Sequence, residues 1–212
     1  MNNNVNNNGY DYVDLGLPSG TLWATCNVGA SKPSESGLYF QWGDTQGYTT
    51  DQVGAGDGQK YFGWEEYKWM ADESAPNDVS VSIFSKYNKE GETLELEDDA
   101  AHVNMNGNWY MPTSKQLQEL IDNTTTAWTT SDGISGMTFT SKKDTSKFIF
   151  IPAAGNAWDG SVNSSGDKGY VWSSMLSTNY VFCGQHLGFK PGGASLINIH
   201  RGYGFPVRGV IG

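Results

Sequence analysis

The sequence has few positively charged residues for its length. Lys and Arg together number 13 among 212 residues, against 23 Asp and Glu, so the formal net charge is −10. Proteins that bind nucleic acid or anionic lipid gather Lys and Arg into clusters, because contacts with phosphate supply much of the affinity. The sequence contains no such cluster. We therefore expect neither nucleic acid nor an anionic membrane surface as a partner.

Long hydrophobic stretches are also missing. No run approaches the roughly 18–20 apolar residues that a transmembrane helix needs, so we expect no membrane insertion. The first nine residues, MNNNVNNNG, have neither the basic flank nor the apolar core of a signal peptide. We expect residues 1–9 to be a flexible, Asn-rich leader and residues 10–212 to be one domain.

Cysteine is scarce, with only Cys26 and Cys183 in the chain. One pair does not make a disulfide framework, and a chain of this length buries a sizeable core without covalent staples. We expect two free thiols, although the spacing leaves a single disulfide open.

Glycine and aromatic residues are abundant instead. The chain contains 27 Gly, 8 Trp and 11 Tyr, whereas charged residues make up only 17% of it. Such a composition is typical of a loop-rich fold with short strands rather than of a helical protein. A long irregular stretch from residue 46 to residue 77 fits this interpretation, because long loops of this kind are often functional.

The clearest helix is predicted over residues 114–123. Thr113 can act as its N-cap, and Gln116 follows three residues later, as in a capping box. Leu117, Leu120 and Ile121 recur at the spacing of one buried helical face. A shorter helix is predicted over residues 98–103, where Asp98 and Asp99 would stabilise the positive end of the helix dipole.

The remaining regular structure is predicted to be short strands separated by turn residues. Two strands are expected before the helices and a small antiparallel meander after them, which makes the fold class α+β. The expected strands cover residues 10–15, 21–27, 137–141, 147–155, 169–175, 185–189, 195–200 and 205–211.

The segment YVFCGQHLGFKPGGASLINIHRGYGF, residues 180–205, is unusual. Its residue types follow one another without a clean alternation, a charge pattern or a helical period. Loops have this character, yet parts of the segment read as strands. This composition indicates that requirements other than packing selected these side chains.

Five motifs in a fixed order resemble a known family. They are similar to the C-type-lectin-fold domains of gut Bacteroidales and their phages, which are related to the formylglycine-generating-enzyme fold and to the major paralogous domain of Fibrobacter. The resemblance implies a small twisted antiparallel core, two helices and long irregular loops. The motifs are YVDLGLPSGTLWATCNVGA (12–30), LEDDAAHVNMNGNWYMPTSKQLQELI (96–121), IFIPAAG (149–155), GYVWSS (169–174) and GFPVRGV (204–210).

Many members of this family are variable proteins of diversity-generating retroelements. Their variable region lies between motifs similar to YVWSS and GFPVRGV, so the resemblance implies a variable, ligand-binding region at about residues 180–203. These retroelements mutate adenines, mostly in Asn codons, and such codons cannot become Gln or Lys; Gln185 and Lys190 are therefore interpreted as scaffold. The expected variable face consists of residues that these codons can reach: Val181, Phe182, Cys183, His186, Gly188, Ser195, Ile197, Asn198, Ile199, His200, Gly202 and Tyr203.

Two other kinds of site could use some of these residues. A zinc site needs closely and regularly spaced ligands, and Cys183, His186 and His200 do not have that spacing, so we expect no metal and no cofactor. Formylglycine-generating relatives use a pair of cysteines near the C-terminus, whereas Cys183 stands alone there. We therefore expect no catalytic residues and no enzyme activity.

The resemblance implies a display protein that binds a protein or glycan receptor on a cell surface. Its natural setting would be a phage virion tail or a bacterial cell surface, and an oligomer remains open. The alternatives are a catalytic descendant of the formylglycine-generating-enzyme fold that acts on a peptide cysteine, and an invariant structural surface domain.

Overall fold

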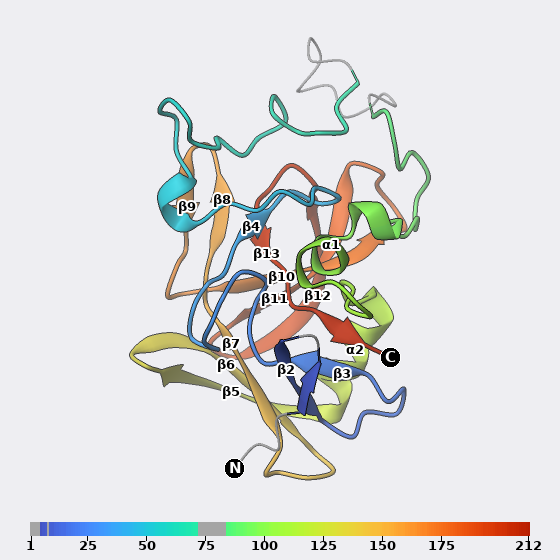
Figure 1. The fold of residues 1–212 in the computed structure, drawn as a ribbon, viewed down its shortest axis with the longest axis vertical. Helices are drawn as coiled ribbons and strands as arrows, with labels where there is room; N and C mark the ends of the chain where they lie inside the picture. The colour runs from blue at the N-terminus through green and yellow to red at the C-terminus, as the bar shows by residue number, and fades with distance from the viewer. Residues whose placement is uncertain (1–4, 8, 72–83) are drawn as a thin grey trace.

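The computed structural model describes residues 5–7, 9–71 and 84–212. These residues form small antiparallel sheets with two α-helices, an α+β arrangement (Figure 1). Among them no helix combines the length and the apolar character needed to cross a bilayer. The strands are β1 Val5–Asn7, β2 Tyr10–Asp14, β3 Leu22–Ala24, β4 Tyr39–Phe40, β5 Thr124–Ser131, β6 Ile134–Ser141, β7 Phe148–Pro152, β8 Asn156–Trp158, β9 Ser161–Asn163, β10 Gly169–Leu176, β11 Cys183–Lys190, β12 Gly193–His200, β13 Phe205–Pro206 and β14 Val210–Ile211; the helices are α1 Ala100–Met105 and α2 Ser114–Asn123.

The two ends of the chain meet in one sheet with the strand order β1-β2-β3-β14. Here the structure differs from the expected flexible leader, because Val5–Asn7 pairs with Tyr10–Asp14 in antiparallel register. The Asn-rich composition gave no sign of this strand, since ladder hydrogen bonds join backbone groups whatever the side chains are. Residues 1–4 and 8 of the expected leader lie outside the described residues.

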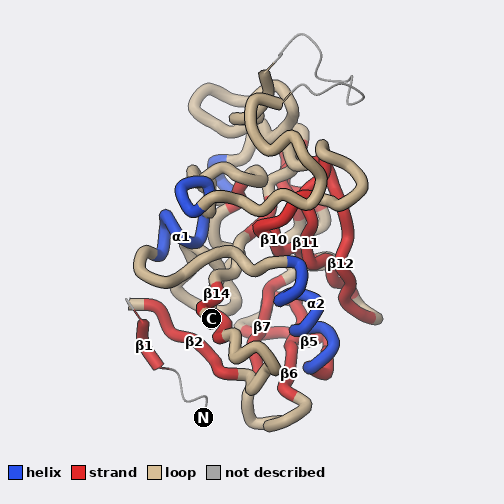
Figure 2. The backbone as a smooth tube through the Cα atoms, turned by 90° about the vertical axis from the view of Figure 1, so that its right-hand side faces the viewer, coloured by secondary structure: helices blue, strands red, loops and turns tan. Residues whose placement is uncertain are grey.

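Helix α2 begins and ends where the sequence predicts. The Thr113 side chain accepts a hydrogen bond from the Gln116 backbone N–H, and the Gln116 side chain accepts one from the Thr113 backbone N–H, which completes the capping box. Leu117 and Leu120 are fully buried, and Ile121 packs partly against the same core. Figure 2 shows α2 lying along the strands of the lower half of the molecule.

The second predicted helix is correct for Asp99 but not for Asp98. Asp99 is the N-cap of α1 and accepts the backbone N–H of His102. Asp98 ends the 3-10 turn Leu96–Asp98 and binds Lys86, Lys68 and Tyr87 instead. The helix-dipole argument could not predict that only Asp99 caps the helix, because the partners of Asp98 come from another part of the chain.

The sheet β5-β6-β7 contains a strand that the sequence did not predict. Strand β5 has the sequence TTTAWTTS, which is too polar to stand out as a strand, yet its burial alternates along much of its length. It pairs with β6 from Thr124 opposite Ser141 to Ser131 opposite Ile134. Thr is β-branched and suits a half-exposed pleated surface, which explains the strand in retrospect.

The core is rich in aromatic side chains. Trp23, Trp42, Trp109 and Trp172 are fully buried. Arg208 is fully buried too, and its guanidinium donates to Asn27 Oδ1 at 2.9 Å and to two backbone carbonyls at 3.0 Å. Both cysteines are free thiols, as expected.

Long loops occupy the upper half of the molecule (Figure 2). In the described part of the predicted irregular stretch, residues 46–71, the only regular element is the 3-10 turn Thr50–Gln52. Residues 72–77 of that stretch lie outside the described residues.

Candidate ligand-binding face

The unusual segment forms most of a three-stranded antiparallel sheet with the order β10-β11-β12. Strand β12 is an edge strand of this sheet, and its residues alternate between two faces. On the inner face Leu196 lies opposite Leu187 and Ala194 lies opposite Phe189, all against the core. Leu187 and Phe189 are buried, so the inner face of the hairpin is fixed by packing.

The outer face of β12 carries Ser195, Ile197 and Ile199. Ser195 is exposed and Ile197 is 46% exposed, an unusual environment for isoleucine. Ile199 is half-buried, because it packs against the core cluster that contains Trp42 and Trp172. Exposure therefore decreases along the strand toward His200.

An aromatic cluster continues this surface beyond the end of β12. The Tyr203 ring stacks on Trp158 with centroids 4.1 Å apart and an angle of 16°. The His200 ring lies 5.3 Å from Trp64 and 5.6 Å from Phe182. Burial lowers the pKa of His200 and so favours the neutral form of its ring. We use the term open face for the expected residues that reach this surface: Val181, Phe182, Ser195, Ile197, Ile199, His200 and Tyr203.

His186 was expected on this face but is 1% exposed. It lies directly opposite Ile197 and on the same side of the sheet. However, it is on the central strand β11, where Phe205 covers it at a centroid distance of 4.8 Å and Tyr170 and Trp172 flank it. Burial lowers the pKa of His186 to about 3, and Nδ1 has no hydrogen-bond partner among the described residues.

The two glycines of the expected face are also buried. A Cβ atom at Gly188 would lie 2.9 Å from the Ile197 side chain, and one at Gly202 would lie 3.2 Å from the Gly63 carbonyl oxygen. Gln41 fixes that second contact, because its amide donates to the Gly63 and Gly202 carbonyls at 2.8 Å each. Larger side chains at these glycines would therefore displace their neighbours.

Cys183 and Asn198 are the remaining expected residues that do not belong to the open face. Cys183 is buried, and burial raises its pKa to about 11. The thiol is thus protonated at pH 7, which gives no support to a nucleophilic role. Asn198 lies opposite Gln185, whose side chain accepts a hydrogen bond from Ser114 Oγ of α2, so Asn198 belongs to the inner side of the sheet. Gln185 supports the hairpin, as expected, and Lys190 is exposed at its turn.

The second wall of this surface was not predicted from the sequence. The hairpin β8–β9 faces the open face across a hollow of about 430 Å³, whose lining includes Asn156, Trp158, Ser161, Ile199 and Tyr203. A second hollow of about 410 Å³ continues past Ser195 and Ile197, and both hollows contain Lys168 and Tyr170 in their lining. The signal for the hairpin was the dipeptide Asp159-Gly160, which has the positive φ angles of a tight hairpin turn.

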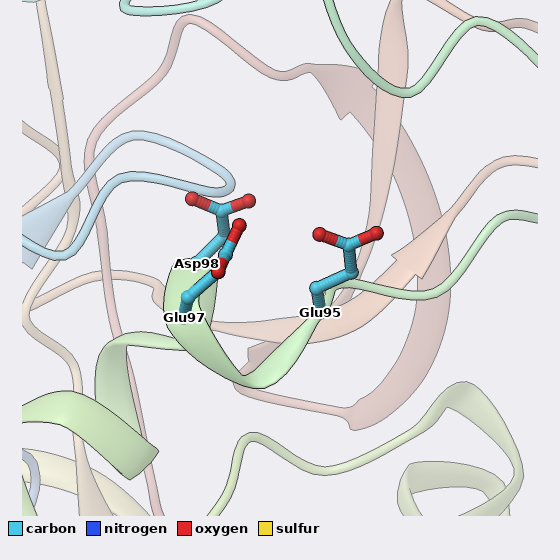
Figure 3. A group of neighbouring side chains, drawn as sticks. All are labelled: Glu95, Glu97 and Asp98. Atoms are coloured by element: carbon cyan, nitrogen blue, oxygen red, sulfur yellow. The ribbon is translucent and has the colours of Figure 1, made fainter.

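Outside this surface, one group of acidic side chains has a spacing that could hold a cation. One carboxylate oxygen from each of Glu95, Glu97 and Asp98 lies within 4.8 Å of the others, and they are the only such group among the described residues. Figure 3 shows the three side chains on one turn of the chain. Lys86 Nζ already lies there, 2.6 Å from Glu95, 3.2 Å from Glu97 and 2.6 Å from Asp98. Burial alone would raise the pKa of Asp98, but hydrogen bonds from Lys86, Tyr87 and Lys68 lower it overall. The cluster is therefore an ion-pair network.

Comparison with known proteins identifies no family for this chain. No protein-family model matches the chain, and neither a curated protein nor a solved structure matches it.

Proposed function

We propose that this chain is a ligand-binding display protein of the C-type lectin fold and a variable protein of a diversity-generating retroelement. Its open face recognises a protein or glycan receptor on a cell surface. The chain serves as a phage receptor-binding protein or as a bacterial surface protein. The ordered motifs support the family, and the α+β arrangement with two helices and long loops is compatible with its fold.

One observation carries the proposal: strand β12 has an inner face that packs against the core and an outer face that is exposed. On β12 the inner residues Ala194 and Leu196 pack against the core, while Ser195 and Ile197, which alternate with them, are exposed. A side chain on the outer face can therefore change without a cavity or a clash in the core. Strands on a fixed frame also present a ligand-binding surface with little loss of conformational freedom on binding.

The surface itself has the composition of a recognition site. Aromatic rings, an exposed isoleucine and polar side chains lie together on the open face and on the hairpin opposite it. Recognition sites commonly combine apolar anchors with a polar surround, and a few anchors carry most of the binding energy.

Binding to whole cells tests the proposal. The fluorescently labelled chain is incubated with a panel of gut Bacteroidales cells, and bound fluorescence is measured by flow cytometry. Ile197→Asn should remove the signal, because it changes the most exposed apolar side chain of the open face. Ile134→Asn is a matched control, because Ile134 is 45% exposed but belongs to another sheet. Equal cell binding by both variants would contradict the proposal.

A further inference from the structure

We propose that the hollow between the hairpin β8–β9 and the open face binds a neutral saccharide unit. This inference rests on the proposed function, and it narrows the receptor from a protein or glycan to a glycan. The hollow measures about 430 Å³, which is at the small end of the range for ligand pockets. That size suits a small polar ligand or one unit of a longer chain.

The wall formed by the hairpin supplies hydrogen-bonding groups of both kinds. Asn156 offers an amide, and Ser161 offers a hydroxyl. Asn163 offers its amide oxygen as an acceptor, because its Nδ2 already donates to the Trp158 and Ser161 carbonyls. Amides and hydroxyls both donate and accept hydrogen bonds. A ligand that carries several hydroxyl groups, each also a donor and an acceptor, can pair with all of them. These residues lie outside the segment 180–203, so this polar wall stays the same when the open face changes.

Aromatic rings from both sides also line the hollow, Trp158 from the hairpin and Tyr170, Tyr203 and Phe205 from the other side. Tyr203 is stacked on Trp158, and Tyr170 is stacked on Phe205 with centroids 4.7 Å apart. Stacking holds the rings in place before a ligand arrives. A pyranose ring has an apolar C–H face and a rim of hydroxyls, so it can contact the rings with the face and the hairpin with the rim.

The charges around the hollow favour a neutral ligand. Its lining carries one carboxylate, Asp159, and one ammonium, Lys168. Asp159 already accepts a hydrogen bond from the Tyr61 hydroxyl. The two formal charges cancel locally, and the chain as a whole has a net charge of −10, which repels polyanions.

The exposed apolar surface is too small to favour a flat protein partner. Among the described residues, the large hydrophobic side chains exposed on this side are Tyr180 and Ile197, whereas Leu96, Val103, Ile134 and Phe148 belong to other elements. Stable protein interfaces bury about 800 Å² on each partner around an apolar centre. A hollow with a polar wall and aromatic rings matches a saccharide better.

A microarray of neutral bacterial and mucin-type oligosaccharides tests the inference. The unaltered chain should bind at least one saccharide, and Ser161→Trp, which fills the hollow from an exposed position, should weaken that binding by at least about tenfold. Thr129→Trp, at an exposed position on β5, is the matched control and should bind as the unaltered chain does. Binding of the unaltered chain should change by less than about threefold between low and high salt, because salt does not screen contacts with a neutral ligand.

Thermal melting establishes whether Ser161→Trp is folded. A second variant, Trp158→Phe, keeps a ring at this position but makes it smaller, so it should bind the saccharide more weakly. The inference is overturned if no saccharide binds, if Ser161→Trp binds unchanged, or if high salt abolishes binding.

Cell binding separates this inference from the proposed function. Periodate cleaves the vicinal diols of sugars, whereas a protease removes surface proteins, so binding should be lost after periodate and should survive the protease. Binding that resists periodate but is lost with Ile197→Asn would overturn the inference that the ligand is a saccharide, and the proposed function would still hold. Binding that Ile197→Asn does not change would refute the proposed function itself.

Discussion

The most telling stability prediction concerns Ile197 and Leu187, two aliphatic residues of one hairpin that differ in exposure. Full burial of an isoleucine side chain contributes about 1.5–3 kcal/mol, and Ile197 is 46% exposed. Ile197→Asn therefore forfeits about half of that contribution, roughly 1 kcal/mol. Leu187 lies on the inner face of the same hairpin and is fully buried, so Leu187→Ala should cost about 2–5 kcal/mol as a core truncation.

Urea unfolding followed by tryptophan fluorescence measures both values, and Ile134→Asn serves as the control. Because Ile134 is 45% exposed, its substitution should cost about as much as that of Ile197. In thermal melts of a chain of this size, 1 kcal/mol corresponds to about 2–4 °C. A loss of 3 kcal/mol or more for Ile197→Asn would show that the outer face of β12 is part of the core. The claim that only the inner face of β12 packs would then be wrong.

Four further predictions follow from the fold and the site. Leu120→Ala should destabilise the chain by about 2–5 kcal/mol in urea unfolding, and a loss under about 0.5 kcal/mol would mean that α2 does not bury this face. Thr113→Ala should cost about 0.5–2 kcal/mol by removing the N-cap, whereas Ser146→Ala on an exposed turn should cost less. The pKa of His186 is lowered from 6.5 to about 3, so between these pH values the unfolded chain binds a proton that the folded chain does not. The free energy of unfolding should therefore fall as the pH drops from 6.5 toward 3. His186→Gln should reduce this pH dependence, and an unchanged pH dependence would mean that other groups cause it. Binding at the open face should be the same in EDTA and in calcium, and loss of binding in EDTA would reveal a metal-dependent site.

Elements were predictable from the sequence where local chemistry decides them. Helix α2 was placed at both ends because Thr113 and Gln116 cap it and because Leu117 and Leu120 recur at helical spacing. The inward direction of Leu187 and Phe189 was predictable as well, since apolar residues two apart on a strand lie on the same face.

The environment of His186 was not predictable, because its cover comes from distant parts of the chain. Phe205 and Tyr170 enclose it, and codon chemistry says nothing about which strand lies in the middle of a sheet. The hairpin β8–β9 was missed for a similar reason. Its side chains acquire a role only when the fold places them opposite Ile199 and Tyr203.

Sequencing of the DNA beside the coding region tests most directly whether this face is built to vary. The account predicts a reverse-transcriptase gene and a near-copy of the stretch that encodes residues 180–203. The copy should differ at adenines in codons of the open face, such as those of Ser195, Ile197 and Tyr203, and it should match at the codons of Gln185 and Lys190. Absence of a near-copy, or differences that fall equally on the codons of the buried residues Leu187 and Phe189, would contradict the account.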